Sequence, residues 1–400
     1  MKLFTFLLTS SLLVNPGIVM AEKISKTASS IRIATFNVSM EALNYLPSEL
    51  GKEAKPTGKE LAQALKQNHQ QIRNIAEIIQ RVNPDIILLN EFDSNDKTHQ
   101  SLKLFLSKYL AKSQQGEKAL TFPYFYQGPV NTGVASGYDL NNDNKIGELP
   151  SDAFGYGLFS GHFGMSLLSK YPIVEDKVRT FQLFKWRDMP NAMMPIDPET
   201  KAPWFNEKAW NNFRLSSKSH WDIPLNVNGE ELHILASHPT PPVFDGPEDR
   251  NGKRNFDEIR FWIDYLTPNV AGYIYDDKKQ YGGLGENKAF VILGDLNADA
   301  VDGDAIKPGI QGLITHARVN DPTPSSKGGQ LHKKDNPNAK YHTAYWGMRA
   351  DYVLPAKQQL QVINSGIFWP TVKEAEFRLI KDRAASSDHR LVWVDVAFKE

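Results

Sequence analysis

Short apolar runs separated by amphipathic segments predict strands and helices that alternate along much of the chain. The first predicted strand is Ile31–Phe36, which ends at Asn37. Apolar residues from Ile72 to Ile79, spaced three and four apart, predict a helix, and the following Asn-Pro pair ends it. The next predicted strand is Asp85–Leu89, with Asn90 and Glu91 at its end. The order is therefore strand, helix, strand, with a polar residue after each strand.

The same pattern continues to the C-terminus. Further strands are predicted at Met165–Ser169, Leu232–Ala236, Phe290–Leu293, Ala350–Leu354 and Leu391–Val396. Two more helices are predicted from apolar stripes at 102–109 and 259–266, the second with Asn255 and Glu258 as a capping box. We interpret residues 31–398 as a single domain with insertions near 112–164 and 180–222, because those stretches show little periodicity.

The N-terminus has the pattern of a secretory signal peptide. Lys2 precedes an apolar run from Leu3 to Val14, and Val19-Met-Ala21 ends in small residues that signal peptidase accepts. We therefore predict a signal peptide over residues 1–21, a leader over 22–30, and an exported protein in the periplasm or outside the cell. The apolar run is too short to cross a bilayer comfortably, so we predict no membrane span.

Composition limits the candidate chemistry. Lys plus Arg and Asp plus Glu each number 46, and the sequence pI is about 7.2, which argues against a strongly basic nucleic-acid-binding surface. The chain has no cysteine, so disulfides and thiolate metal sites are excluded. Any bound metal must be held by oxygen and imidazole donors.

The strand predicted at Phe290–Leu293 is followed by two polar residues, Asp295 and Asn297. In an extended chain alternate side chains share a face, so these two are expected to point together. A carboxylate and a carboxamide at the end of a buried strand are costly unless they are hydrogen-bonded or bind a ligand. The alternative is a simple turn, since Gly, Asp and Asn are turn formers.

Polar residues at the other strand ends favour a functional site. They are Asn37, Glu91, His238, Asp388 and His389, with Asp351 inside a sixth strand. Oxygen donors of this kind suit Mg²⁺, Mn²⁺ or Ca²⁺, and a metal next to a carboxylate that activates water suits phosphoester hydrolysis. Histidines can donate hydrogen bonds to phosphoryl oxygens, with a carboxylate behind each ring to fix its tautomer.

Six motifs in this order, IATFN, IILLNE, LASH, ILGDLNAD, RADYVL and SSDH, resemble the endonuclease/exonuclease/phosphatase superfamily over residues 31–398. The resemblance implies an α/β (α+β) four-layer sandwich, in which two mixed β-sheets pack face to face with helices outside. It implies metal-site roles for Asn37, Glu91, Asp295 and Asp388. It also implies that Asp295 and Asn297 activate and orient water, that His238 and His389 contact phosphate, and that Asp351 positions His238. One departure is Pro239, which stands where the family usually has leucine.

A second cation site is predicted in the first insertion. Asp139, Asn141, Asp143 and the Lys145 backbone match the start of a calcium loop. Pro150 occupies the twelfth position, where an acidic ligand is usual, so Glu148 or Asp152 would have to replace it. The alternative is a solvated turn. Bound Ca²⁺ would brace the insertion and take no part in catalysis.

We expect a phosphatase that releases phosphate from small organic phosphate esters, because the chain lacks the basic stripe on which nuclease affinity depends. A secreted nuclease or another phosphodiesterase is the alternative, and nucleic acid is then the substrate. A calcium-dependent binding protein without catalysis is the third interpretation. Loop residues expected near the substrate are Arg187, Arg250, Arg254 and His342. No protein partner is predicted.

Overall fold

The computed structural model describes residues 26–27, 30–46 and 55–399. The predicted signal peptide, 1–21, and most of the leader, 22–30, lie outside the described residues. Among the residues that are described, no helix has the length and apolar character needed to cross a bilayer.

The first of two mixed sheets has six strands in the order β10-β11-β1-β2-β4-β3. Its strands are β1 Ile31–Met40, β2 Ile86–Phe92, β3 Tyr124–Tyr126, β4 Met165–Ser169, β10 Leu360–Ile367 and β11 Val392–Phe398. β1 and β2 are parallel, and the other neighbours are antiparallel. β1 is buried along its whole length, as expected for a parallel strand that is covered on both faces.

The second sheet has five strands in the order β5-β6-β7-β8-β9. They are β5 Arg179–Thr180, β6 His220–Val227, β7 Glu230–Ser237, β8 Ala289–Asp295 and β9 Asp351–Pro355. β7 and β8 are parallel, and the other pairs are antiparallel. The sheets pack through β1 and β2 against β8, and through β1 and β11 against β9. The buried apolar core lies between the sheets and under their helices.

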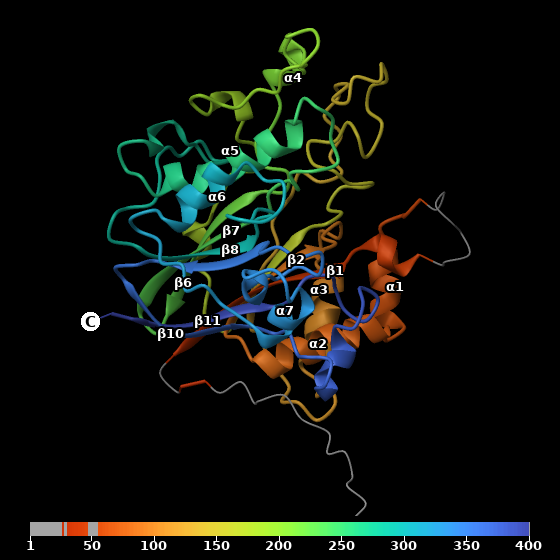
Figure 1. The fold of residues 1–400 in the computed structure, drawn as a ribbon, viewed down its shortest axis with the longest axis vertical. Helices are drawn as coiled ribbons and strands as arrows, with labels where there is room; N and C mark the ends of the chain where they lie inside the picture. The colour runs from red at the N-terminus through yellow and green to blue at the C-terminus, as the bar shows by residue number, and fades with distance from the viewer. Residues whose placement is uncertain (1–25, 28–29, 47–54, 400) are drawn as a thin grey trace, which may run out of the picture.

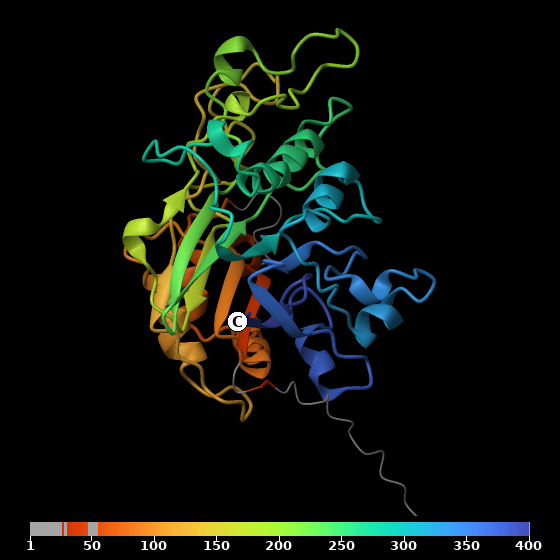
Figure 2. The same ribbon diagram turned by 90° about the vertical axis from the view of Figure 1, so that its left-hand side faces the viewer.

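Helices lie outside both sheets (Figures 1 and 2). Their bounds are α1 Glu60–Lys66, α2 Gln70–Val82, α3 Gln100–Leu104, α4 Glu207–Trp210, α5 Arg250–Tyr265, α6 Lys307–Ile314 and α7 Lys327–His332. In α2, the Gln71 side chain donates to the Val38 carbonyl of β1 at 3.1 Å. In α5, the Trp262 indole donates to Ser237 Oγ of β7 at 2.9 Å. The predicted sandwich of two mixed sheets with outer helices is confirmed.

The structure differs from the predicted elements in three details. β6 and β10 were not predicted, because β6 contains Pro224 and begins inside the 180–222 segment, and because β10 exposes several of its side chains. The predicted capping box is also wrong, since α5 begins at Arg250 and both Asn255 and Glu258 lie inside it. The helix predicted over 102–109 is α3 followed by a π-helical segment, Phe105–Leu110.

A buried ion pair joins the first and last long strands of the domain. Arg32 of β1 donates from Nε and Nη2 to the two Asp395 oxygens of β11, each at 2.7 Å. Its Nη1 donates to the Val82 carbonyl at the end of α2 at 2.8 Å. The guanidinium also lies 4.1 Å from the centre of the Trp393 ring. One side chain therefore ties β1, β11 and α2 together.

Replacing Arg32 with methionine should lower the free energy of unfolding by about 3 to 5 kcal/mol, because the Asp395 carboxylate then stays buried without its partner. Urea unfolding of the two proteins measures the difference. The double variant Arg32→Met/Asp395→Leu should recover much of the loss. A loss below about 1 kcal/mol in the single variant, the size expected of a surface ion pair, would contradict this account.

Candidate active site

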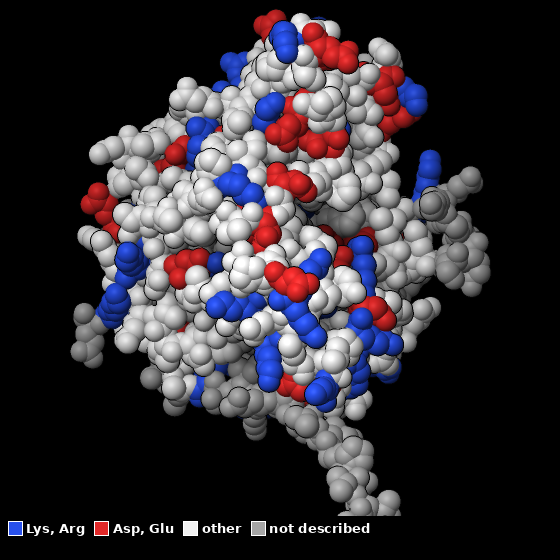
Figure 3. Space-filling view, viewed as in Figure 1, with Lys and Arg blue, Asp and Glu red and all other residues white. Residues whose placement is uncertain are grey.

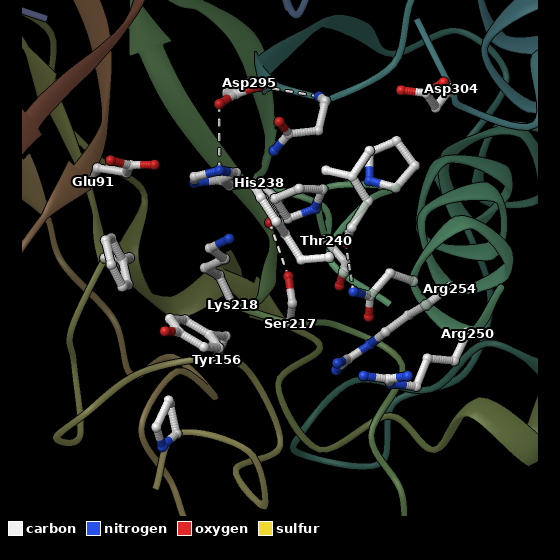
Figure 4. A pocket seen from close by; sticks show the side chains of 18 of the residues that line it. Glu91, Tyr156, Ser217, Lys218, His238, Thr240, Arg250, Arg254, Asp295 and Asp304 are labelled. Atoms are coloured by element: carbon white, nitrogen blue, oxygen red, sulfur yellow. Dashed lines mark hydrogen bonds and ion pairs between the residues drawn. The ribbon is translucent and has the colours of Figure 1, made fainter. Parts of the chain in front are cut away.

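The polar residues predicted at strand ends gather at one edge of the two sheets. β1, β2, β7, β8 and β9 place Asn37, Glu91, His238, Asp295 and Asp351 there, and His389 precedes β11. This edge opens into a cavity of about 1090 Å³ (Figure 4). The predicted residues on its wall are Glu91, His238, Asp295, Asn297, Asp388 and His389. Asn37 and Asp351 are completely buried and contact the wall residues from behind.

Contacts from both sheets converge on Asp295. Asn37 Nδ2, from the other sheet, donates to Asp295 Oδ2 at 3.0 Å, and the Asn297 amide donates to Oδ1 at 3.0 Å. The Nε2 atoms of His238 and His389 lie 3.4 and 3.6 Å from Oδ2. Burial raises the pKa of Asp295 to about 7, although His389 opposes the shift. A carboxyl that titrates near neutrality is suited to accept a proton from water.

Asn297 reaches the cavity by a different route from the predicted one. Its φ of 51° is left-handed, so the chain turns after β8 and does not continue as alternating extended residues. The Asn297 side chain donates to the Pro239 carbonyl at 3.1 Å. The end of β8 therefore forms a turn and also lies on the wall of the candidate active site.

Asp351 positions His389, and the prediction that it positions His238 is wrong. Asp351 Oδ2 lies 2.9 Å from His389 Nδ1 and accepts a hydrogen bond from Thr343 Oγ1 at 2.7 Å. The reason is strand order, because β8 separates β9 from the end of β7, which carries His238. Burial lowers the pKa of His389, but the Asp351 and Asp295 carboxylates outweigh it and raise that pKa to about 10. His389 is therefore a cation whose Nε2 faces Asp295.

His238 is the uncharged member of the histidine pair. Burial, reinforced by the nearby Lys218 amine, holds its pKa well below the usual value, and its Nδ1 has no hydrogen-bond partner. Helix α5 holds the segment that follows it. Glu258 Oε2 accepts from the Thr240 amide at 2.7 Å, and Asn255 Nδ2 donates to the Thr240 carbonyl at 2.8 Å. The two residues predicted to cap α5 therefore fix the loop beside His238.

Glu91 and Asp388 form the acidic side of the cavity. Glu91 is the penultimate residue of β2 and has a left-handed backbone with φ of 55°, which is unusual for this residue type. Burial raises the pKa of Glu91, while His389 and Asn37 lower it. Asp388 is more exposed, at 27%, and accepts from Ser39 Oγ at 3.4 Å. The two carboxylates both line the cavity.

The donor atoms fit a hard divalent cation. Ligand atoms of Asp295, Asp351 and His389 lie within 4.8 Å of one another, but protonated His389 leaves only the two carboxylates as donors. Asp351 Oδ1 is buried and has no hydrogen-bond partner, so a bound cation would satisfy it. With the oxygens of Glu91 and Asp388 nearby, this set suits Mg²⁺, Mn²⁺ or Ca²⁺.

Lys218 is a site residue that sequence reasoning missed. It is 6% exposed, it lines the cavity, and its amine points toward His238 (Figure 4). Burial lowers the pKa of Lys218, whereas Glu91, Glu258 and Asp295 raise it. The residue lies just before β6, so recognising that strand would have placed a basic residue at its start, beside the end of β7.

The candidate calcium loop has the contacts of a closed turn. The Asp139 carboxylate accepts from the amides of residues 143 and 144, and Asp143 Oδ1 accepts from the Lys145 amide at 2.9 Å. Asn141 donates to Asp143 at 3.1 Å. The buried acid here is Asp152, which accepts three backbone amides. These contacts match the solvated-turn alternative, and calcium binding stays a prediction.

The four predicted substrate-loop residues separate into two pairs. Arg250 and Arg254 line the cavity, and Arg254 is held by carbonyls of Leu215 and Phe154. Arg187 is exposed and bonds to Asn211, away from the cavity wall. His342 is buried 3.0 Å from Asp302 and does not line the cavity either.

Comparison with known proteins places the chain in a family. The sequence profile of the Endonuclease/Exonuclease/phosphatase family matches residues 34–389. No curated protein matches the sequence. Several solved structures are similar in fold. An endonuclease/exonuclease/phosphatase from Beutenbergia cavernae DSM 12333 has 16% identity and a TM-score of 0.49, with 92% of this chain and 72% of that chain covered.

Two further similar structures are the human Nocturnin catalytic domain with bound sulfate and a Staphylococcus aureus beta toxin mutant with bound magnesium ions. The first has 14% identity and a TM-score of 0.46, with coverage of 93% and 94%. The second has 16% identity and a TM-score of 0.41, with coverage of 91% and 99%. Likeness at this level concerns the fold alone.

The metal-free protein should become less stable relative to Asp295→Asn as pH rises from about 4 to about 7. The folded pKa of Asp295, about 7, exceeds the unfolded value of about 4, so ionisation opposes folding in this window. The difference in unfolding free energy should change by at most about 4 kcal/mol. Denaturant unfolding of both chelator-treated proteins across this range measures it. A difference that does not vary with pH would contradict the assignment.

Proposed function

Because the chain belongs to the endonuclease/exonuclease/phosphatase family, we propose that it is an exported, divalent-metal-dependent phosphatase acting on small organic phosphate esters. Family membership and the buried acidic site support phosphoester hydrolysis as the general reaction. The observation that carries the proposal is Asp295, a buried carboxyl with a pKa near 7 between two histidines and a cross-sheet asparagine.

Asp295 takes a proton from the attacking water at Oδ2, the oxygen that faces the two histidines. The water oxygen forms a bond to phosphorus as the ester P–O bond breaks, and the leaving oxygen takes up a proton from solvent. Asn297 lines the same wall and orients the water. Its own side chain is held by the Pro239 carbonyl, so it is fixed before substrate binds.

Cationic and neutral donors surround the position of the phosphoryl group. His389 carries a proton at Nε2, because Asp351 and Asp295 raise its pKa to about 10. Lys218 offers its amine beside neutral His238. Donors placed before the reaction stabilise the charge that develops on phosphoryl oxygens. Glu91, Asp388 and Asp295 would hold Mg²⁺ or Mn²⁺, which would supply positive charge to the phosphoryl oxygens when bound.

The charge distribution favours a small ester over a nucleic acid. Basic and acidic side chains are interspersed on the face shown in Figure 3, without a continuous basic band across it. The cavity is walled by residues 140–163 on one side and 238–254 on another, so the catalytic groups lie within a pocket. Nuclease affinity depends on many phosphate contacts along an open groove. Export is proposed from the signal-peptide pattern of residues 1–21.

With Mn²⁺ or Mg²⁺, the purified mature protein should release phosphate from a nucleoside monophosphate and leave plasmid DNA intact. Phosphate release and gel mobility measure the two activities, and excess chelator should abolish turnover. Cleavage of DNA without turnover of the monoester would favour the nuclease alternative. Absence of hydrolysis on either substrate, in protein shown to bind metal, would favour a non-catalytic binding protein.

Lys218→Met should lower kcat/KM by about 10- to 100-fold, the effect of losing one charge-assisted hydrogen bond. Steady-state kinetics on the preferred substrate measures the change. Lys208→Met, which removes an exposed lysine from the same 180–222 segment, is the matched control and should change little. Equal kinetics in both variants would exclude Lys218 from substrate contact.

A further inference from the structure

The cavity of the candidate active site is larger than a phosphoryl group requires. Its volume of about 1090 Å³ reaches the size of pockets that enclose whole ligands, roughly 300–1,000 Å³. The polar residues of the site lie at strand ends, whereas apolar side chains of three other segments complete the wall. They are Tyr156 and Phe163 of the first insertion, Phe244 of the loop before α5, and Trp346 and Met348 before β9. The alcohol part of an ester bound in this cavity therefore lies against these segments.

Three aromatic rings on this wall are exposed to solvent. The exposed fraction is 64% for Tyr156, 87% for Phe244 and 45% for Trp346. Exposed apolar side chains that gather around one cavity are typical of a ligand-binding surface. A ligand that covers such rings removes apolar surface from water, which favours binding.

The Trp346 ring contacts His389. The centroids of the two rings lie 5.0 Å apart, with their planes at 82°. His389 directs Nε2 toward Asp295 Oδ2 at 3.6 Å, so the indole lies beside the imidazole that is proposed to contact the phosphoryl group. The Tyr156 ring, by contrast, pairs with Phe163 at 6.3 Å. Trp346 is therefore the exposed ring placed to meet the part of the alcohol next to the ester bond.

A short hairpin carries Trp346. Ala344 pairs with Met348 across this hairpin, and the Gly347 amide donates to the Ala344 carbonyl at 3.0 Å. That hydrogen bond closes a four-residue turn in which Trp346 is the third residue. Gly347 has a φ of 101°, which glycine adopts without steric cost. The turn therefore projects Trp346 from the end of a regular hairpin.

Backbone contacts join this hairpin to the segment that carries His389. Ala344 pairs with His389 itself. The Tyr345 amide donates to the Asp388 carbonyl at 2.8 Å, and the Arg390 amide donates to the Thr343 carbonyl at 2.7 Å. The hairpin is thus held on both sides of the histidine, so the indole is positioned before any ligand binds, which favours specific recognition.

We propose that Trp346 determines specificity for phosphate esters whose alcohol part carries a flat aromatic ring, and that this ring packs against the indole. The inference rests on the proposed function and deepens it, because it names the chemical class of the leaving group. Two aromatic rings attract each other by offset or edge-to-face contact in addition to the effect of buried area. A saturated ring of similar size gains less from the indole.

Benzyl phosphate and cyclohexylmethyl phosphate test the proposal, because both are esters of primary alcohols with a six-membered ring and only one ring is flat. With Mn²⁺ present, the native mature protein should show a kcat/KM about 3- to 10-fold higher for the benzyl ester. Phosphate release measures both rates. Trp346→Leu keeps an apolar side chain but removes the flat face, so the ratio should fall toward about 1. Trp346→Phe keeps a flat ring and should retain most of the native ratio.

Tyr345→Leu is the matched control. Tyr345 belongs to the same hairpin, is 51% exposed and lies outside the cavity wall, and its ring contacts His332 at 4.6 Å. This variant should keep the native kcat/KM for both esters. Equal losses on the two esters in Trp346→Leu would show a purely structural indole and overturn the proposal, as would a native ratio in that variant.

The native protein decides the question even if a Trp346 variant fails to fold, because equal kcat/KM values for the two esters would overturn the proposal. Failure of the proposed function is separately visible. If neither ester is hydrolysed, the phosphatase is refuted, and calorimetry with benzylphosphonate and cyclohexylmethylphosphonate then tests recognition alone. Tighter binding of the aromatic compound, lost in Trp346→Leu, would support the indole as its binding surface. Equal binding of the two compounds, or none, would overturn it.

Discussion

The hydrogen bond from Asn37 to Asp295 joins the two sheets at the edge where the candidate active site lies. Asn37 lies in β1, one of the two parallel strands of the first sheet, and Asp295 lies in β8, one of the two parallel strands of the second. The geometry of the site therefore depends on how the sheets pack. Asp295 is 1% exposed, and a carboxylate in that position requires donors or a cation. Asn37, the Asn297 amide and cationic His389 supply part of that compensation. The remaining deficit accounts for the raised pKa of Asp295, and for this reason we propose that carboxyl as the base for water.

The sandwich and the central residues of the site were predictable from sequence, because both follow from short buried strands. The apolar pattern shows where each strand ends. A polar side chain at a buried strand end must form hydrogen bonds or bind a ligand. Asp295 and Asn37 were found in this way, although Asn297 reaches the cavity through a left-handed turn and not through strand alternation. Strand ends alone do not give strand order. The predicted partner of Asp351 was wrong for that reason, since β8 stands between Asp351 and His238.

The residues that were missed lie where no periodic pattern exists. Lys218 precedes β6, a strand hidden by Pro224 and by the aromatic segment before it. The position of Lys218 arises from a tertiary contact, the pairing of β6 with β7 that brings it beside the end of β7. Local sequence carries little information about such contacts.

The central claim is that this edge of the sandwich directs a water molecule onto phosphorus, with Asp295 as its base. Hydrolysis of a phosphate monoester in water labelled with heavy oxygen, followed by phosphorus NMR and mass spectrometry, tests it most directly. The account predicts that one labelled oxygen enters each released phosphate, that the alcohol stays unlabelled, and that Asp295→Asn shows neither product. Label in the alcohol, or native rates of labelled phosphate release by Asp295→Asn, would contradict it.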